Sequence, residues 1–434
     1  MMAFDFSHYQ RQWEGLSHSF ETHDTASVRV ARHLTEITDF GSNPGNLRML
    51  VHVPAEIAPG PALVIALHGC SQTAIAYDQG AGWSALADKH GFFVLLPEQQ
   101  SANNPMNCFS WFERTDMGRD QGEPLSIRQM VEKMIVDHGI DRSRVFITGL
   151  SAGGAMTAVM LATYPEVFAG GAIIAGLPYG TACNFHEAFQ SMLHGTEREA
   201  KTWGDLVRAA SPHGGPWPKL SIWHGTEDTT VKPLNAGEIV KQWSDLHGVN
   251  HAAPLHETVD NYPRRVWYGP LGDAILEEYE LTGMDHGTPV DTNHVEAAGD
   301  AGPFFLDVGI SSTYHIARFW GLLEKTPKKS ATEPEMAQPS AELIAEPVVE
   351  EVFLVSEAAP VVPELESMPV VELPLLVPHA LTPVAFAAEP AGEAEFFAEE
   401  EEEIEDQNDE DRHSFFDLHG LLNKALKAAG LIKS

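Results

Sequence analysis

A serine inside a G-x-S-x-G turn is the residue whose surroundings most clearly predict chemistry in this chain. Ser151 lies at the centre of Gly149-Leu-Ser-Ala-Gly153, directly after a run of β-branched and aromatic residues and before a helix-forming run. Small residues two places before and after the serine allow a tight bend between a strand and a helix, which holds the hydroxyl clear of the sheet. This strand–turn–helix bend around Ser151 is called the elbow below. The G-x-S-x-G pattern can also arise by chance, so the prediction depends on the strand-like run before it and the helix-forming run after it. Ser151 is the candidate nucleophile.

A serine nucleophile needs a base to take its proton and an acid to orient that base. The loop His224-Gly-Thr-Glu-Asp228 follows an apolar run, and we favour Asp228 over Glu227 because the shorter carboxylate at a strand end can point back across a sheet. The alternative is that both are surface charges. His286 lies in a later turn with glycines on both sides, and its position after the serine and the acid predicts the base.

Attack on a carbonyl creates an oxyanion that two preorganised N–H groups must stabilise, and losing one typically costs about a hundredfold to a thousandfold in turnover. The residue after the nucleophile, Ala152, supplies one backbone N–H. The loop His68-Gly-Cys70-Ser follows an early strand, and Cys70 is expected to supply the other. A reactive thiol at Cys70 is the competing interpretation.

The elements that must position these residues are apolar runs alternating with helix-like segments. Strands are predicted at residues 62–68, 92–97, 145–150, 168–176, 219–225 and 276–282. The run 62–68 is apolar up to His68 without polar alternation, which is typical of a strand buried on both faces of a parallel sheet. This order predicts an α/β fold, with a mostly parallel central sheet, helices on both faces and the site at the carboxyl ends of the strands. Residues 177–215 are predicted to form a helical insertion.

Composition divides the 434 residues into four segments. We expect an N-terminal helical or irregular segment at 1–40, a catalytic domain at 41–325, a Pro/Glu-rich acidic linker at 326–413 and an amphipathic helix at 414–434. Residues 331–410 contain no lysine or arginine, 22 acidic residues and ten prolines, which predicts disorder. The net charge of −35 argues against nucleic acid and anionic membranes as partners of the main body.

The N-terminus shows no secretory leader, and no apolar run reaches the roughly 20 residues of a membrane helix. Cytoplasm is therefore the expected compartment, with an extracellular location left open. Three cysteines do not predict a disulfide framework or a zinc site. Cys70 and Cys108 could pair in an oxidising compartment, and otherwise remain reduced thiols. We expect no metal and no cofactor.

An ordered set of motifs resembles the polyhydroxybutyrate (PHB) depolymerase family of esterases, within the α/β-hydrolases. The matching pieces lie between about residues 45 and 322 and are Leu67-His-Gly-Cys-Ser-Gln72, Asp78-Gln-Gly-Ala-Gly-Trp83, Asn107-Cys-Phe-Ser-Trp-Phe112, Ser126-Ile-Arg-Gln-Met130, Gly149-Leu-Ser-Ala-Gly-Gly-Ala-Met156, Ala175-Gly-Leu-Pro-Tyr-Gly180, Trp223-His-Gly-Thr-Glu-Asp228 and Gly283-Met-Asp-His-Gly287. The resemblance implies a serine esterase of short-chain polyhydroxyalkanoates or their oligomers, with Ser151, Asp228 and His286 at the triad positions. Secreted members of the family carry a signal peptide and a separate polymer-binding domain, and from the sequence we expect neither here.

Three further questions follow from that resemblance. Related carbohydrate esterases that release acetyl or feruloyl groups share the fold and the elbow, so they are the alternative activity. Phe109, Trp111, Phe112 and Trp223 are candidates for an apolar slot that holds the acyl unit, with core packing as the alternative for each. The apolar stripe of residues 414–434 could anchor the enzyme on a polymer granule or a partner helix, pack on its own domain, or belong to a scaffold or granule-surface protein.

Overall fold

The computed structural model of the protein describes residues 33–293, 296 and 299–323, all of which belong to one compact unit, Met1–Ala337. The predicted acidic linker at 326–413, the amphipathic helix at 414–434 and most of the N-terminal segment lie outside the described residues. The four segment boundaries therefore stay predictions. One element falls within the segment 1–40: strand β1 (Thr35–Ile37), which pairs antiparallel with β2 (Arg48–His52).

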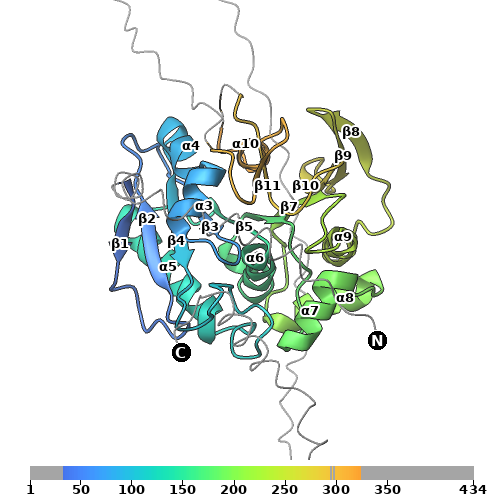
Figure 1. Ribbon diagram of the computed structural model, residues 1–434, viewed down its shortest axis with the longest axis horizontal. Helices are drawn as coiled ribbons and strands as arrows, with labels where there is room; N and C mark the ends of the chain where they lie inside the picture. Colours follow the sequence, from blue (N-terminus) through green and yellow to red (C-terminus); the bar gives the residue numbers. More distant parts are fainter. Residues whose placement is uncertain (1–32, 294–295, 297–298, 324–434) are drawn as a thin grey trace, which may run out of the picture. The chain divides into compact units, whose positions relative to one another are not determined.

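A ten-stranded sheet forms the centre of the fold, in the order β1-β2-β4-β3-β5-β6-β7-β10-β9-β8 (Figure 1). The six central strands, β4-β3-β5-β6-β7-β10, are parallel to one another. The strand pairs at both edges of the sheet are antiparallel. The remaining strands are β3 (Leu63–Leu67), β4 (Phe93–Glu98), β5 (Val145–Leu150), β6 (Gly170–Ile174), β7 (Lys219–Gly225), β8 (Leu255–Val259), β9 (Tyr262–Tyr268) and β10 (Ala274–Leu281), with a separate parallel pair β11 (Thr288–Val290) and β12 (Phe305–Asp307). The predicted mostly parallel sheet is confirmed.

Helices cover both faces of this sheet, as predicted. They are α3 (Ala74–Ala81), α4 (Trp83–His90), α5 (Gly122–His138), α6 (Ala152–Thr163), α7 (Phe185–His194), α8 (Ala200–Ala210), α9 (Leu234–Leu246) and α10 (Ser312–Phe319), with a short 3₁₀ turn, η2 (Pro165–Val167). Successive residues of β3 point to opposite faces. Ile65 packs in the core that contains Met156 of α6, whereas Val64 packs in the other core with Trp83 of α4 and Ile316 of α10.

The segment predicted as a helical insertion contains α7 and α8. Asn184 caps α7 by accepting the Glu187 N–H at 3.0 Å, because its side chain supplies the acceptor that the first turn of a helix lacks. Trp203 of α8 is fully buried and donates its indole N–H to Glu238 of α9 at 2.6 Å. The helical prediction for this segment is confirmed.

A buried charged cluster joins the strands that lead to the candidate acid and base. Glu277 of β10 is 1% exposed, and it accepts hydrogen bonds from Ser221 of β7 at 2.6 Å and from Nε of Arg264 of β9 at 2.9 Å. Burial raises the pKa of Glu277, and the Arg264 guanidinium opposes that shift. The same Ser221 hydroxyl accepts the indole N–H of Trp223 at 2.8 Å. These bonds fix β7, β10 and β9 relative to one another.

We predict that Arg264→Met lowers the free energy of unfolding by about 3 to 5 kcal/mol at pH 7, because it leaves the Glu277 carboxylate buried without its cation. The pKa of Glu277 would then rise further above its unfolded value, so the loss should shrink as the pH falls toward 4 and the folded protein binds the proton. Urea unfolding at several pH values measures this. Arg265→Met is the matched control, because its partner Glu278 is less completely buried and its own side chain is 40% exposed; equal losses in the two variants would contradict the prediction.

Candidate active site

The strand, turn and helix predicted around Ser151 are present. The turn has φ 57° and ψ −116° at Ser151, a strained backbone for a residue with a side chain. A Cβ on Gly149 would lie 2.4 Å from the backbone of Gly153, and a Cβ on Gly153 would lie 2.3 Å from the carbonyl oxygen of Leu67. The backbone N–H of Ser151 donates to Ile174 of β6 at 2.9 Å. Only glycine fits at both flanking positions, which explains the sequence pattern.

Asp228 and His286 form a buried hydrogen-bonded pair. Nδ1 of His286 lies 2.7 Å from Oδ2 of Asp228, while Oδ1 accepts the backbone N–H groups of Thr230 at 2.9 Å and Val231 at 2.8 Å. Burial alone would raise the pKa of Asp228, but hydrogen bonds from His224 and His286 outweigh it and hold this pKa below its usual value. The ionised carboxylate keeps the proton of His286 on Nδ1, which leaves Nε2 free to act as a base.

Three neighbouring loops at one edge of the sheet carry Ser151, Asp228 and His286. They follow β5, β7 and β10, which lie in the order β5-β6-β7-β10 and run parallel, so their carboxyl ends meet at the same edge. A backbone hydrogen bond of 3.0 Å from Glu227 N to Met284 O joins the second and third of these loops. The topology thus brings the three sequence-predicted residues to one edge.

The loop after β3 lies against the elbow. A Cβ on Gly153 would lie 2.6 Å from the carbonyl oxygen of His68. Within this loop Gly69 N donates to the Gln72 side chain at 2.8 Å and Ser71 N donates to Met106 O at 2.6 Å. In the described part of the chain the N–H of Cys70 has no such acceptor, and Ala152 begins α6, where N–H groups lack partners within the helix. Both expected oxyanion donors are thus available on adjoining segments.

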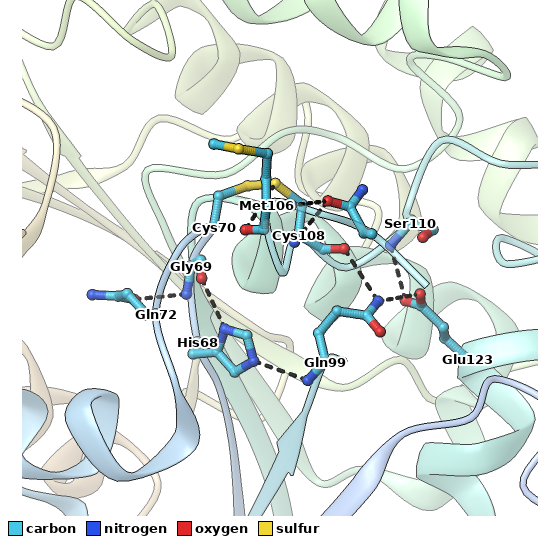
Figure 2. The surroundings of a disulfide bond; sticks show 10 residues. His68, Gly69, Cys70, Gln72, Gln99, Met106, Cys108, Ser110 and Glu123 are labelled. Carbon is cyan, nitrogen blue, oxygen red and sulfur yellow. Dashed lines mark hydrogen bonds between the residues drawn. A yellow bond between two sulfur atoms is a disulfide. The ribbon is translucent and has the colours of Figure 1, made fainter. Parts of the chain in front are cut away.

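A buried histidine orients the peptide that carries the Cys70 N–H (Figure 2). His68 is fully buried, and burial lowers its pKa to about 4, so the ring is neutral at pH 7. Its Nδ1 lies 2.8 Å from Gly69 O, and its Nε2 accepts the backbone N–H of Gln99 at 3.1 Å. Gly69 O and the Cys70 N–H belong to one planar peptide unit. The hydrogen bond from His68 therefore fixes the direction in which Cys70 points its N–H.

A buried carboxyl group anchors the facing loop, residues 107–112. Glu123 of α5 is 2% exposed; it accepts the side-chain N–H of Gln99 and, at 2.9 Å, the backbone N–H of Ser110. Gln99 also donates to Cys108 O at 3.1 Å. Burial raises the pKa of Glu123 to about 8, because these donors only partly offset the loss of solvation. Sequence analysis missed Gln99 and Glu123, and the only signal was that Gln99 directly follows an apolar strand.

Cys70 and Cys108 form a disulfide bond, with an Sγ–Sγ distance of 2.04 Å and a Cα–Cα distance of 4.2 Å (Figure 2). This settles the pairing that the sequence left open, and it removes the alternative of a reactive thiol at Cys70. Cys183 is the free cysteine among the described residues. The disulfide joins the loop after β3 to residues 107–112, so it holds the Cys70 peptide from the side opposite His68.

The four aromatic candidates for a substrate slot divide into two groups. Trp223 is fully buried with its ring stacked on Tyr279 at a centroid distance of 3.7 Å, and Phe109 is fully buried against His68 at 4.9 Å. Both observations favour the core-packing alternative that the sequence left open for these two residues. Trp111 and Phe112 pack edge to face at 5.3 Å and keep a small exposed fraction.

We predict that replacing both Cys70 and Cys108 by serine lowers the free energy of unfolding by about 3 to 4 kcal/mol, because the disulfide closes a loop of 38 residues in the unfolded chain. Turnover of a p-nitrophenyl ester should fall at least about tenfold, because the Cys70 N–H loses one of its supports. Urea unfolding and initial rates measure the two effects. Cys183→Ser is the control and should match wild type; full turnover in the double variant would show that the disulfide does not support the site.

Comparison with known proteins identifies the family. Residues 50–260 match the model of the esterase PHB depolymerase family. The chain is 49% identical over 292 residues to poly(3-hydroxyalkanoate) depolymerase C of Paucimonas lemoignei, covering 67% of this chain and 70% of that protein. It is 37% identical over 256 residues to acetylxylan esterase A of Aspergillus oryzae, covering 57% and 82%. The solved acetyl xylan esterase from Aspergillus awamori superimposes with a TM-score of 0.57 at 28% identity, covering 67% and 99%.

The fold and the relatives define a carboxylic ester hydrolase with the α/β-hydrolase fold. Within that class, the chain belongs to the PHB depolymerase family of esterases, so the resemblance stated from the sequence is confirmed. No helix within residues 33–293, 296 and 299–323 is long and apolar enough to cross a membrane.

Proposed function

We propose that the protein hydrolyses ester bonds of short-chain polyhydroxyalkanoates, such as poly(3-hydroxybutyrate), or of their oligomers. Ser151 is the nucleophile, His286 the general base and Asp228 the residue that orients it. The observation that carries the proposal is the buried hydrogen bond of 2.7 Å between His286 and Asp228, on the sheet edge where Ser151 occupies its strained turn. The likeness to a poly(3-hydroxyalkanoate) depolymerase supports the substrate class.

In this mechanism Nε2 of His286 takes the proton of Ser151 as Oγ attacks the ester carbonyl. The oxyanion of the tetrahedral intermediate accepts hydrogen bonds from the backbone N–H groups of Cys70 and Ala152. Protonated His286 then gives its proton to the departing alkoxide, which leaves an acyl-enzyme on Ser151. Water repeats the cycle and releases the acid. Asp228 stays ionised throughout and stabilises the imidazolium by accepting its Nδ1–H.

Trp111 and Phe112 are the remaining candidates for an apolar slot that holds a methyl-bearing acyl unit. Phe112 contacts Phe185 of α7 edge to face at 6.0 Å, and Phe185 is 55% exposed. Aromatic rings that extend from a buried loop to the surface offer apolar area to a polyester chain.

The second candidate function is hydrolysis of acetyl or feruloyl esters of carbohydrates by the same triad. It is favoured by the likeness to two acetylxylan esterases, one of which matches over 99% of its own solved chain. Because the catalytic residues would be unchanged, only the substrate distinguishes the two candidates.

We predict that the wild-type protein releases 3-hydroxybutyrate from amorphous polymer or soluble oligomers, and that Ser151→Ala lowers this rate by about a thousandfold or more. Acetylated xylan, a feruloyl ester and p-nitrophenyl esters are assayed in parallel. The exposed Ser143→Ala serves as the control and should keep full activity. Activity on the carbohydrate esters alone would favour the second candidate, whereas activity that survives Ser151→Ala would contradict the assignment of the nucleophile.

For the compartment, we favour an oxidising environment over the cytoplasm expected from the sequence. The disulfide between Cys70 and Cys108 supports this, because such bonds form and persist in oxidising compartments and are rare in the cytosol.

Residues 414–434 are proposed to anchor the enzyme on an apolar polymer surface; they lie outside the described residues, and the proposal stands on their apolar stripe alone. We predict that deletion of residues 411–434 reduces co-sedimentation with polymer granules while hydrolysis of soluble oligomers is retained. Unchanged sedimentation would contradict the anchor.

A further inference from the structure

A second histidine contacts the carboxylate of Asp228. His224 is the penultimate residue of β7 and is 5% exposed. Its Nε2 lies 2.8 Å from the carbonyl oxygen of Val231 and 3.3 Å from Oδ2 of Asp228. The same Oδ2 receives the Nδ1–H of His286 at 2.7 Å. The candidate acid therefore lies between two imidazole rings, and the proposed mechanism uses only one of them.

The surroundings of His224 define its protonation. Both neighbours of Nε2 are acceptors, so this nitrogen carries a proton and shares it between Val231 O and Asp228 Oδ2. Nδ1 is buried and has no hydrogen-bond partner among the described residues. A second proton on Nδ1 would create a buried N–H without an acceptor, which is costly. The Nε2–H of His224 is thus aimed at the carboxylate, and its Nδ1 faces no acceptor among the described residues.

This N–H completes the set of donors around Asp228. Oδ1 accepts two backbone N–H groups, from Thr230 and Val231, and Oδ2 accepts from His286 and His224. An ionised carboxylate offers about four acceptor positions, and all of them are used. Without His224 the two bonds to Oδ1 would remain, so the carboxylate would stay near its place but Oδ2 would have only His286 as a donor.

The charged groups that face His224 are few. From β10, Glu278 acts electrostatically on His224, and it is itself paired with Arg265 of β9. Glu280 is the cross-strand partner of His224 in the register of β7 and β10, but it is exposed to solvent. Within the part of the chain that the structure describes, Asp228 and His286 are the other titratable groups that contact this site. A change in the pH dependence of a His224 variant would therefore report on the pair of Asp228 and His286.

We propose that His224 is a positioning residue for the hydrolysis: its Nε2–H holds Oδ2 of Asp228 in line with Nδ1 of His286 and shares the negative charge of that oxygen. The inference rests on the proposed function, because it assigns His224 to the same triad. A structural role is the competing explanation, since the bond to Val231 O also fastens the turn at residues 228–231 to the end of β7.

The decisive pair of variants is His224→Gln and His224→Asn, measured in the full chain with a soluble p-nitrophenyl ester between pH 5 and 9. The amide nitrogen of glutamine can reach the position of Nε2, whereas that of asparagine is too short to do so. We expect His224→Asn to lower kcat by about tenfold to a hundredfold with KM changed less than about twofold, because an orienting group acts on the reacting complex rather than on substrate binding. His224→Gln should recover most of kcat.

The pH profile separates positioning from structure. The acid limb of kcat/KM reports the protonation of the catalytic base in the free enzyme. With one donor fewer, Asp228 holds more charge on Oδ2 and stabilises the imidazolium of His286 more strongly, so the limb should move to higher pH in His224→Asn. A limb that is unchanged, or moved to lower pH, would overturn the proposal, and so would a glutamine variant as slow as the asparagine variant.

His247→Asn is the matched control. His247 is a partly buried histidine whose Nε2 also bonds to a backbone carbonyl, that of Pro218 at 3.1 Å, but Pro218 precedes β7 at the end of the strand opposite His224. This variant should lose stability while its acid limb stays at the wild-type position. Ser151→Ala, assayed beside it, distinguishes a failure of the proposed function from a failure of the role proposed for His224. If Ser151→Ala keeps activity, the proposed function fails; if it is inactive while His224→Asn behaves as wild type, only the role of His224 fails.

Discussion

The close approach of two backbones, the elbow after β5 and the end of β3, is the constraint on which the rest of the site depends. Gly153 lies so near the carbonyl oxygens of Leu67 and His68 that a methyl group there would overlap both. This approach sets the strained turn at Ser151 and brings the start of α6 beside the loop that carries Cys70. The two N–H groups expected to stabilise an oxyanion are adjacent for the same reason. A larger residue at Gly153 would separate them.

The loop after β3, which carries Cys70, has little regular structure of its own, and its geometry comes from buried polar groups around it. His68 fixes the peptide between Gly69 and Cys70 from one side, and the disulfide to Cys108 fixes it from the other. Gln99 and Glu123 bind the loop that carries Cys108. Buried hydrogen bonds of this kind define one geometry, because any displacement would leave a polar group without a partner. The loop is therefore preorganised before a substrate arrives.

Two buried carboxyl groups near the site have pKa values shifted in opposite directions, and their donors explain the difference. Asp228 faces two histidines and two backbone N–H groups, so its charged form is stabilised. Glu123 has uncharged donors from Gln99 and Ser110, and the charge of nearby Asp116 adds to the cost of burial. One carboxyl group is thus held in its charged form, as the proposed mechanism requires, whereas the other binds the loop of residues 107–112. Burial by itself does not distinguish these roles.

The sequence by itself determined the fold class, the family and the order of the candidate triad. The apolar runs of β3 and β5 and the glycines around Ser151 are local consequences of burial and backbone sterics, so they can be read from a single sequence. The antiparallel edge strands β1, β8 and β9 were not predicted. Their half-polar patterns carry little signal, because strand pairing depends on neighbours distant in the chain.

Only the tertiary structure decided which of the predicted residues lie in the core and which others support the site. For Trp223 the sequence left a substrate slot and core packing open, and its full burial and stacking on Tyr279 favour the core. Gln99 and Glu123 carry no local pattern that separates them from other polar residues, and His224 lies in the motif of Asp228 without a role that the motif itself indicates. The contacts of all three residues follow from packing across the fold. Hydrogen-bond partners and burial are set by packing between segments far apart in sequence, and the order of residues alone does not specify that packing.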